Sequence, residues 1–276
     1  MVSANGSNGA HTNGSTNAPA QGRLAGKVAL VTGAGMGIGE AIAHKLALEG
    51  ASLLIADFNG DAGKKVTASL QSSGTPAEFV QADVTKREDW DRVVEAAKQA
   101  FGRVDILVNN AGTAYEAQSS LTVAEKDFDR VYAVNVKSIF HSVQAVFPLM
   151  ISHGGGSVVN ISSIAALRPR GKLVWYNSSK AAVSNATKAL AHEFGPDGIR
   201  VNAVCPVLVP TQLANSFVPT FENTPEGRAK AAQLFQIPLG RLTTTEDVAN
   251  MVCWLAGEES SFITGTDNNV DGGRSI

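Results

Sequence analysis

Residues 32–39 read TGAGMGIG, a glycine-rich turn between a short apolar run and an amphipathic segment. The run KVALVT at 27–32 is rich in β-branched residues and predicts a buried strand. Residues 38–50 have helical periodicity, and Gly50 ends them. Such a turn lets backbone N–H groups and a helix N-terminus face a pyrophosphate, where a Cβ atom would collide with the phosphates. A strand before the glycines and a helix after them therefore predict a dinucleotide-binding loop.

The same alternation of strand and helix continues along the chain. The predicted strands lack polar/apolar alternation, which is typical of a parallel sheet covered by helices on both faces. We predict one α/β domain over 23–276 with a doubly wound, six- to seven-stranded parallel sheet, a Rossmann fold. An irregular stretch at about 207–240 interrupts the alternation, and 211–240 within it is predicted to form a lid. The other strands are expected at 51–57, 77–83, 104–112, 156–162, 198–205 and 268–273, and the other helices at 61–74, 87–102, about 125–150, 176–194 and 245–257.

Composition and charge narrow the classes of partner. The formal net charge of the 276 residues is −2, so we expect neither nucleic acid nor an anionic membrane as a partner. Uninterrupted apolar runs fall well short of the ~20 residues that span a bilayer. Residues 1–22 are rich in Asn, Gly, Ser and Thr, lack an apolar signal region and predict a disordered tail. Together these features favour a cytoplasmic protein.

Cysteine and histidine usage points to neither a disulfide nor a metal. Cys205 and Cys253 each stand in an apolar setting and are predicted to be buried free thiols. The five histidines show no metal-ligand spacing, so we expect no metal site.

Asp57 ends the second predicted strand, 18 residues after Gly39. A carboxylate there can accept hydrogen bonds from the adenosine ribose, and it would repel a 2′-phosphate. The glycine turn carries no Arg or Lys, and Met36 stands where a phosphate-binding cation would be. Both features favour NAD over NADP. The alternative, that Asp57 only shapes the turn before Asn59-Gly60, stays open at this point.

The chain resembles the classical short-chain dehydrogenase/reductase family from about residue 24 to residue 273. The motifs that carry the resemblance are TGAGMGIG at 32–39, Asp83-Val84, NNAG at 109–112, Asn135, the pair Ser162-Ser163, and Tyr176-Asn-Ser-Ser-Lys180. By this resemblance the cofactor contacts are expected from Gly33, Gly35, Met36, Gly37, Ile38, Gly39, Asp57, Phe58, Asp83, Val84, Asn110, Ala111, Tyr176, Lys180, Val209 and Thr211.

The family's catalytic tetrad maps onto Asn135, Ser163, Tyr176 and Lys180. Ser163 lies 13 residues before Tyr176, the family's usual interval, which makes Ser162 the weaker choice. Tyr176 and Lys180 are four residues apart and therefore lie on one face of a helix. We expect the ammonium and a bound nicotinamide to lower the pKa of the phenol, so that it can exchange a proton with the substrate. Asn135 would hold a water linked to Lys180.

For the segments that shape the substrate pocket, the sequence predicts roles less specifically than for the cofactor site. Val207 follows Pro206 where the family often has glycine, and it would add bulk near the nicotinamide. The lid carries four large apolar side chains that would either cover the substrate or pack the lid onto the body. Three cations, in the stretch 167–175, could meet an anionic substrate, but a solvated loop is the favoured interpretation. The apolar residues are Phe217, Phe221, Leu234 and Phe235, and the cations are Arg168, Arg170 and Lys172.

Three functions follow from these patterns. The first is an oxidoreductase that transfers a hydride between NAD(H) and a secondary alcohol or ketone, with Tyr176 as general acid/base. The second is an NADPH-dependent carbonyl reductase, of the 3-oxoacyl kind. The third is a dinucleotide-binding regulator without turnover, which an intact tetrad disfavours. The expected partners are a small-molecule alcohol or ketone and further copies of the chain, a homotetramer by resemblance.

Overall fold

A computed structural model describes Met1 and residues 22–276. The predicted disordered tail at 1–22 therefore falls almost wholly outside the described residues. The centre of the fold is a seven-stranded, all-parallel sheet with the order β3-β2-β1-β4-β5-β6-β7. This confirms the predicted doubly wound sheet at the upper end of the expected strand number. The strands are β1 (Val28–Thr32), β2 (Ser52–Asp57), β3 (Ala77–Gln81), β4 (Ile106–Asn109), β5 (Gly156–Ile161), β6 (Ile199–Pro206) and β7 (Asp267–Val270).

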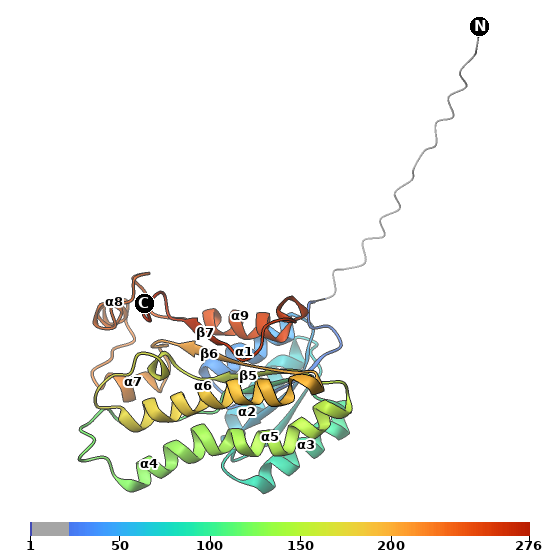
Figure 1. Ribbon diagram of the computed structural model, residues 1–276, viewed down its shortest axis with the longest axis horizontal. Coiled ribbons are helices and arrows are strands. Elements are labelled where there is room, and N and C mark those ends of the chain that lie inside the picture. Colours follow the sequence, from blue (N-terminus) through green and yellow to red (C-terminus); the bar gives the residue numbers. More distant parts are fainter. Residues whose placement is uncertain (2–21) are drawn as a thin grey trace.

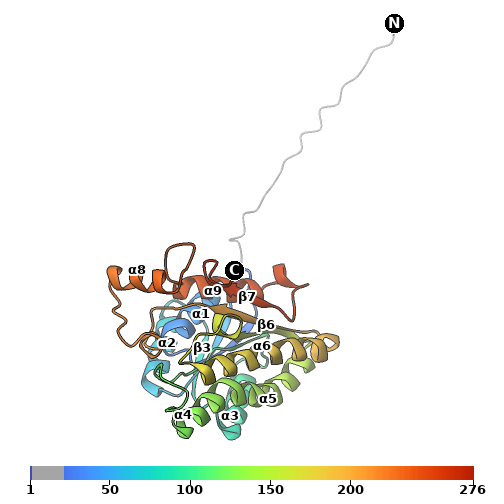
Figure 2. The ribbon, with the colours of Figure 1, turned by 60° about the vertical axis from the view of Figure 1, so that its left-hand side comes forward.

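Helices cover both faces of the sheet (Figures 1 and 2). One face carries α1, α2 and α9, whose apolar side chains share a core cluster with β1 and β2. The other face carries α3, α5 and α6, which enclose a second apolar cluster around Trp90 and Phe147. The main helices are α1 (Gly37–Leu48), α2 (Gly60–Ser72), α3 (Arg87–Phe101), α4 (Glu125–Tyr132), α5 (Ser138–Ser152), α6 (Val174–Phe194) and α9 (Thr245–Ala256).

The strand order reverses between β1 and β4. From β1 the chain builds outward to β2 and β3, and it then returns to place β4 on the other side of β1. In an open α/β sheet, the loops at such a reversal diverge at the carboxyl ends of the strands and leave a crevice. The topology thus puts the glycine turn after β1 and the NNAG segment after β4 beside one another, which fixes where a ligand can enter.

Because the strands are buried on both faces, their sequences lack the polar/apolar alternation of half-exposed strands. All five residues of β1 and all four of β4 are buried, because helices cover both faces. Cys205 and Cys253 are free and buried, as predicted.

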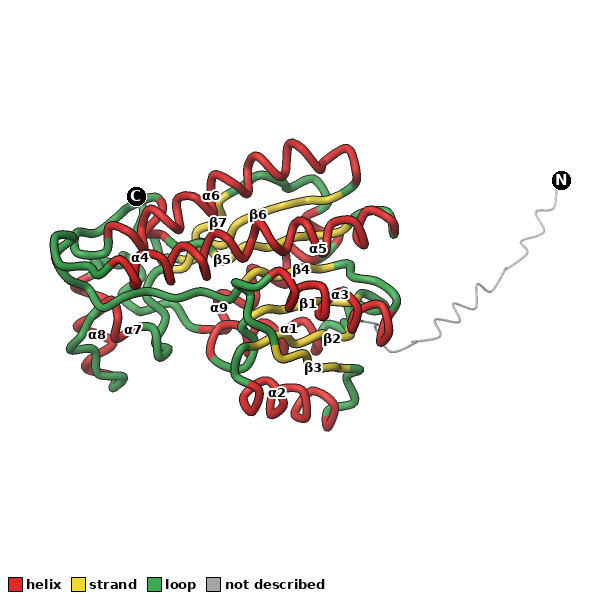
Figure 3. The backbone as a smooth tube through the Cα atoms, turned by 90° about the horizontal axis from the view of Figure 1, so that it is seen from below, coloured by secondary structure: helices red, strands yellow, loops and turns green. Residues whose placement is uncertain are grey.

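The stretch 207–240 is not irregular throughout. It contains two short helices, α7 (Ala214–Phe217) and α8 (Pro225–Leu234), and Thr224 caps the second by accepting from the Gly227 N–H. Figure 3 shows both helices at the same end of the molecule as the C-terminus. The helix with the Tyr-Lys pair begins at Val174, two residues earlier than predicted.

The continuous helix Glu125–Ser152 is long and apolar enough to cross a membrane by length and composition alone. Half of its most apolar window is buried inside the fold, where α4 and α5 pack against α6 and α3. A buried core helix accounts for this apolar character, since the same side chains fill the second core cluster.

Candidate active site

The glycine turn needs its glycines for two separate reasons. Gly33 and Gly37 have φ values of 61° and 60°, a left-handed conformation that other residues rarely adopt. Gly39 has no such constraint, but a Cβ there would overlap the Gly33 carbonyl oxygen and stand 2.5 Å from Asn110 Nδ2. The turn therefore leaves bare backbone at the N-terminus of α1, the arrangement that accepts a pyrophosphate.

Asn110 fastens this turn to β4. Its Nδ2 donates to the carbonyl oxygens of Thr32 and Gly33 at 2.8 and 2.9 Å. The Thr32 hydroxyl accepts in turn from the backbone N–H groups of Asn110 and Ala111, both at 3.1 Å. The side chain of Asn110 thus holds the loop in shape, and Thr32 is a structural member of the site that the sequence did not single out.

Asp57 lies at the carboxyl end of β2, half-buried, with its carboxylate toward the glycine turn. Its Oδ2 accepts from Gly35 N at 2.7 Å and its Oδ1 from Asn59 N at 2.8 Å. Each oxygen keeps a second lone pair for a further donor. Asp57 therefore shapes its turn, while its contact with a ribose stays a prediction.

Asp83 follows β3 and shapes the loop that forms the next part of the cleft wall. Its Oδ1 accepts from the N–H and the hydroxyl of Thr85, while its own N–H donates to Asp89 Oδ2. The carbonyl of Val84 accepts from the indole of Trp90 at 3.0 Å, and the partly buried Val84 side chain packs against the second core cluster. Both residues line the same cleft as the glycine turn.

One cleft of about 1030 Å³ runs along the carboxyl ends of the strands. It brings together fifteen of the sixteen predicted cofactor contacts, and Gly35 is the exception because it lies behind the loop against Asp57. Ser163 also lines the cleft, whereas Asn135 does not. Sequence reasoning missed several lining residues: Ala82, Thr85, Gly112, Thr113, Arg130, Pro210, Gln212, Leu213 and Thr245. Their only signal was position, next to a motif already identified.

Ser163 and Ser162 have different environments. The Ser162 hydroxyl is buried, donates to the Lys180 carbonyl at 3.0 Å and pairs with Ser184. The Ser163 Oγ accepts from Ala165 N, and its contact with the Pro206 carbonyl is long, at 3.5 Å. The Ser163 hydroxyl therefore has only this long contact with a backbone carbonyl and an interaction with the Tyr176 phenol, and its bond to a substrate oxygen stays a prediction.

Burial dominates the electrostatics of Tyr176 and Lys180. Desolvation raises the pKa of Tyr176 to about 12, against a smaller lowering by the Ser163 hydroxyl. Desolvation also lowers the pKa of Lys180 to about 8, and its Nζ donates to the Ile161 carbonyl at 2.8 Å. The expected lowering of the phenol's pKa is thus wrong for the protein by itself: the phenolate is disfavoured by roughly 3 kcal/mol relative to water. The phenol is held as an acid.

Asn135 sits in a π-helical turn, Ala133–Lys137, between α4 and α5. Its Oδ1 accepts from Thr113 N at 2.8 Å, and its Nδ2 donates to the Thr113 carbonyl and to Ser179 Oγ. The side chain is buried and fully engaged, so it braces the loop after β4 against α6. The role of Asn135 in holding a water remains a prediction.

The lid side chains divide between the two expected roles. Phe217 lines the cleft, and the centroid of its ring lies 5.0 Å from that of Tyr176. Phe235 lines a smaller cavity beside the cleft. Phe221 packs within the lid, and Leu234 is exposed. Val207 is buried and lines both spaces, so the departure from glycine does narrow the substrate side.

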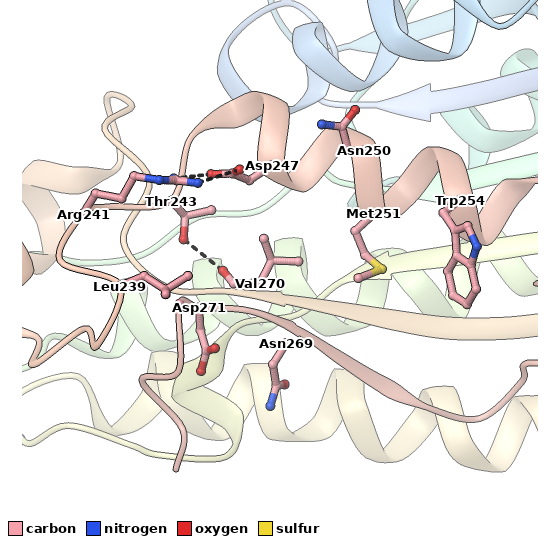
Figure 4. Close-up of a pocket in the computed structure, with 11 residues that line it drawn as sticks. Leu239, Arg241, Thr243, Asp247, Asn250, Met251, Trp254, Asn269, Val270 and Asp271 are labelled. Atoms are coloured by element: carbon pink, nitrogen blue, oxygen red, sulfur yellow. Dashed lines mark hydrogen bonds and ion pairs between the residues drawn. The ribbon is translucent and has the colours of Figure 1, made fainter.

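A separate cavity of about 430 Å³ lies between α9 and β7 (Figure 4). Figure 4 shows the Arg241–Asp247 ion pair and the hydrogen bond from Thr243 to the Val270 carbonyl at its margin. It contains none of the predicted site residues, so the chemistry belongs to the larger cleft.

The family model described as enoyl-(acyl carrier protein) reductase matches residues 33–275. A 4-formylbenzenesulfonate dehydrogenase of Comamonas testosteroni is 43% identical over 250 residues, which cover 91% of this chain and 98% of the relative. The chain belongs to the classical short-chain dehydrogenase/reductase family. This dehydrogenase/reductase is therefore an oxidoreductase that acts on CH–OH and C=O groups with a nicotinamide cofactor.

Two solved structures share its fold. A 3-ketoacyl-(acyl-carrier-protein) reductase from Brucella melitensis, complexed with NADH, has a TM-score of 0.84 and 39% identity, covering 92% of this chain and all of that one. A carveol dehydrogenase from Mycobacterium avium, in complex with NAD, has a TM-score of 0.85 and 30% identity over 92% of this chain and 99% of that one. The cleft of this enzyme suits such a dinucleotide, because the glycine turn at the start of α1 and the side chains of Tyr176 and Lys180 line it together.

Proposed function

We propose that this enzyme is an NAD-dependent dehydrogenase of secondary alcohols and ketones. One observation carries the proposal: Ser163, Tyr176 and Lys180 line a cleft that also contains a fixed carboxylate at Asp57. A carboxylate at the end of the second strand accepts ribose hydroxyls and repels a 2′-phosphate. When bound, the nicotinamide supplies the hydride chemistry, and the chain supplies position and proton transfer.

The roles of the chain's own residues follow from their hydrogen bonds. Ser163 donates its proton to the substrate oxygen and orients the carbonyl carbon. Tyr176, a buried acid, gives a proton to that oxygen during reduction and takes one back during oxidation. Lys180 holds its ammonium on the same helix face and favours the phenolate when it forms. Asn135, tied to Thr113 and Ser179, keeps α6 and the loop after β4 in register.

Cofactor preference is the first test. We expect kcat/KM for NAD to exceed that for NADP by 10- to 100-fold, since a 2′-phosphate would meet the Asp57 carboxylate. Asp57→Asn should shift this ratio at least tenfold toward NADP, because it removes the charge and keeps the shape. Asp61→Asn is the matched control: Asp61 is exposed two residues beyond Asn59 and does not line the cleft, so the ratio should stay within a factor of two. An NADP-preferring wild-type enzyme would refute the NAD assignment.

The pH dependence is the second test. Because the phenol's pKa is raised to about 12, the phenolate fraction increases tenfold per pH unit through the neutral range. Initial-rate kcat/KM for alcohol oxidation should therefore climb steeply between pH 7 and 9. Reduction uses the phenol and should change less than threefold between pH 6 and 7.5. An oxidation rate that is flat over this range would contradict a phenol that keeps this raised pKa when the cofactor is bound.

A 3-oxoacyl reductase is the second candidate. Two similar proteins carry such names, the Brucella melitensis reductase and a 3-oxoacyl-[acyl-carrier-protein] reductase of Thermotoga maritima that is 40% identical. A 3-oxoacyl thioester assayed beside simple cyclic and aromatic ketones separates the two functions. A kcat/KM for the thioester at least 100-fold above every ketone would favour the reductase.

We also propose a cytoplasmic homo-oligomer, a tetramer, with no nucleic-acid or membrane partner. Support comes from the exposed apolar side chains of Phe140 and Ile151 on α5, and from the cavity beside the edge strand β7. Sedimentation equilibrium should give four times the 28.7 kDa chain mass, and a monomer would refute the proposal.

A further inference from the structure

A small cavity continues the substrate side of the cleft beyond the reacting groups. Its volume is about 60 Å³, and it shares Ser163, Tyr176, Val207 and Phe217 with the cleft. It is far smaller than the cleft of about 1030 Å³, so it suits one end of a substrate whose remainder lies in the cleft. Arginines form its far wall, namely Arg168, Arg170 and Arg274.

Arg170 is half-buried in this wall and not part of a solvated loop, contrary to the favoured interpretation of the sequence. Its guanidinium carbon lies 4.3 Å from the centroid of the Phe235 ring, which belongs to the lid. Its backbone carbonyl accepts from Asn177 Nδ2 at 2.7 Å, so Arg170 is anchored to the neighbour of Tyr176. Its Nη1 is buried without a hydrogen-bond acceptor among residues 22–276.

Arg274 reaches the same cavity from the C-terminus. Its Nη1 is also buried and lacks an acceptor within the described part of the chain. Asp271 is the nearest acid by sequence, but its two oxygens accept from the N–H groups of Gly273 and Ser275. Arg168 donates to the carbonyls of Arg274 and Ile276, and so fixes the segment that carries Arg274.

The positive charge of this wall is only partly offset, by the carboxylate of Asp271. Burial lowers the pKa of Arg170, and burial together with repulsion from Arg168 and Arg170 lowers the pKa of Arg274. None of the described residues that line the cavity carries a carboxylate. Buried charged groups are normally paired, because an unpaired one costs several kcal/mol. Two partly buried arginines line one cavity, and each has a buried Nη1 that lacks an acceptor within residues 22–276, which indicates that a ligand provides the anion.

We propose that this cavity binds a carboxylate or sulfonate group on the substrate, and that Arg170 and Arg274 select anionic alcohols and ketones. The inference rests on the proposed dehydrogenase function, because the anion-binding cavity opens onto Ser163 and Tyr176. Guanidinium groups suit planar or tetrahedral oxoanions through paired N–H donors. The substrate's reacting carbon would lie at the cleft and its anionic group at the arginine wall.

The experiment compares ketones that differ only in charge. 4-Acetylbenzoate is paired with 4-acetylbenzamide, and 4-acetylbenzenesulfonate with the corresponding sulfonamide. We expect kcat/KM for at least one anion to exceed that of its neutral partner by 20-fold or more. The pair with the larger ratio identifies carboxylate or sulfonate as the preferred group.

Substitutions of single residues then test whether Arg170 and Arg274 cause the preference for anionic ketones. Arg170→Gln and, independently, Arg274→Gln should reduce the anion-to-neutral ratio toward one, and Arg170→Lys should keep part of it. Lys172→Gln is the matched control: Lys172 lies in the same loop but is exposed and outside the cavity, so its loss should leave the ratio unchanged. A ratio near one in the unsubstituted enzyme, or one that survives both arginine variants, would overturn the proposal.

A binding measurement separates this inference from the proposed function. Calorimetry of the NAD⁺ complex with the same four compounds reports affinity without turnover, because the oxidised cofactor has no hydride to give a ketone. Tighter binding of an anion that is lost in Arg170→Gln would support the anion-binding cavity, even if no ketone is reduced. The absence of ketone reduction would refute only the proposed dehydrogenase function. Equal turnover and equal affinity for charged and neutral ketones would refute the anion site and leave the dehydrogenase standing.

Discussion

Tyr176→Phe is expected to lower kcat by about a thousandfold while NADH still binds. The phenol is buried beside the Ser163 hydroxyl, and general acid–base catalysis of this kind contributes 10²- to 10⁴-fold. Only one oxygen atom is removed, and the ring that packs 5.0 Å from Phe217 is kept. Cofactor fluorescence titration should therefore give a dissociation constant within threefold of the wild type.

Tyr132→Phe is the matched control for this change. The Tyr132 hydroxyl donates to Ser178 Oγ at 2.9 Å, on the same helix as Tyr176, and the residue does not line the cleft. Its loss should cost stability of about 1 kcal/mol and leave turnover within threefold. A Tyr176→Phe enzyme that kept more than a tenth of wild-type kcat would show that another group moves the proton.

Gly39→Ala should abolish dinucleotide binding, with affinity for NADH lowered by more than 100-fold. The added methyl would overlap the Gly33 carbonyl oxygen and press on Asn110 Nδ2, so the turn must open and lose the hydrogen bonds that hold it to β4. The bare backbone at the start of α1 would then no longer face a pyrophosphate. Titration of NADH fluorescence measures the loss directly.

Gly195→Ala is the control for this variant. Gly195 has no neighbouring atom within 4 Å of an added Cβ and no left-handed φ, so the change should leave both affinity and melting temperature nearly unaltered. If Gly39→Ala bound NADH with wild-type affinity, the glycine turn would not be the pyrophosphate site.

Much of the fold could be predicted from local patterns. The buried strands and their helices are continuous in sequence, and the structure places each predicted strand within a few residues. The fourth strand is shorter than predicted because Asn110 turns inward to hold the glycine loop, and its apolar run gave no sign of this. The helices α7 and α8 were missed because their sequence combines prolines, glycine and polar residues with little amphipathic pattern.

For the site too, residues that are close in sequence could be predicted, and residues that only the fold brings together could not. Contiguous motifs such as the glycine turn and the Tyr-Lys pair could be located, since helix and turn geometry fix their neighbours. The arginine wall could not, because it joins Arg170 to Arg274 across more than a hundred residues. The raised pKa of Tyr176 was also missed, since burial is a property of the packed fold and not of the spacing to Lys180.

The Arg168 guanidinium donates to the backbone oxygens of Arg274 and Ile276 and so ties the loop before α6 to the segment that follows β7. The loop that leads into the helix of the reacting tyrosine is thereby fastened to residues more than a hundred positions away. A change at either side of this contact should alter the cavity without touching the proton-transfer machinery.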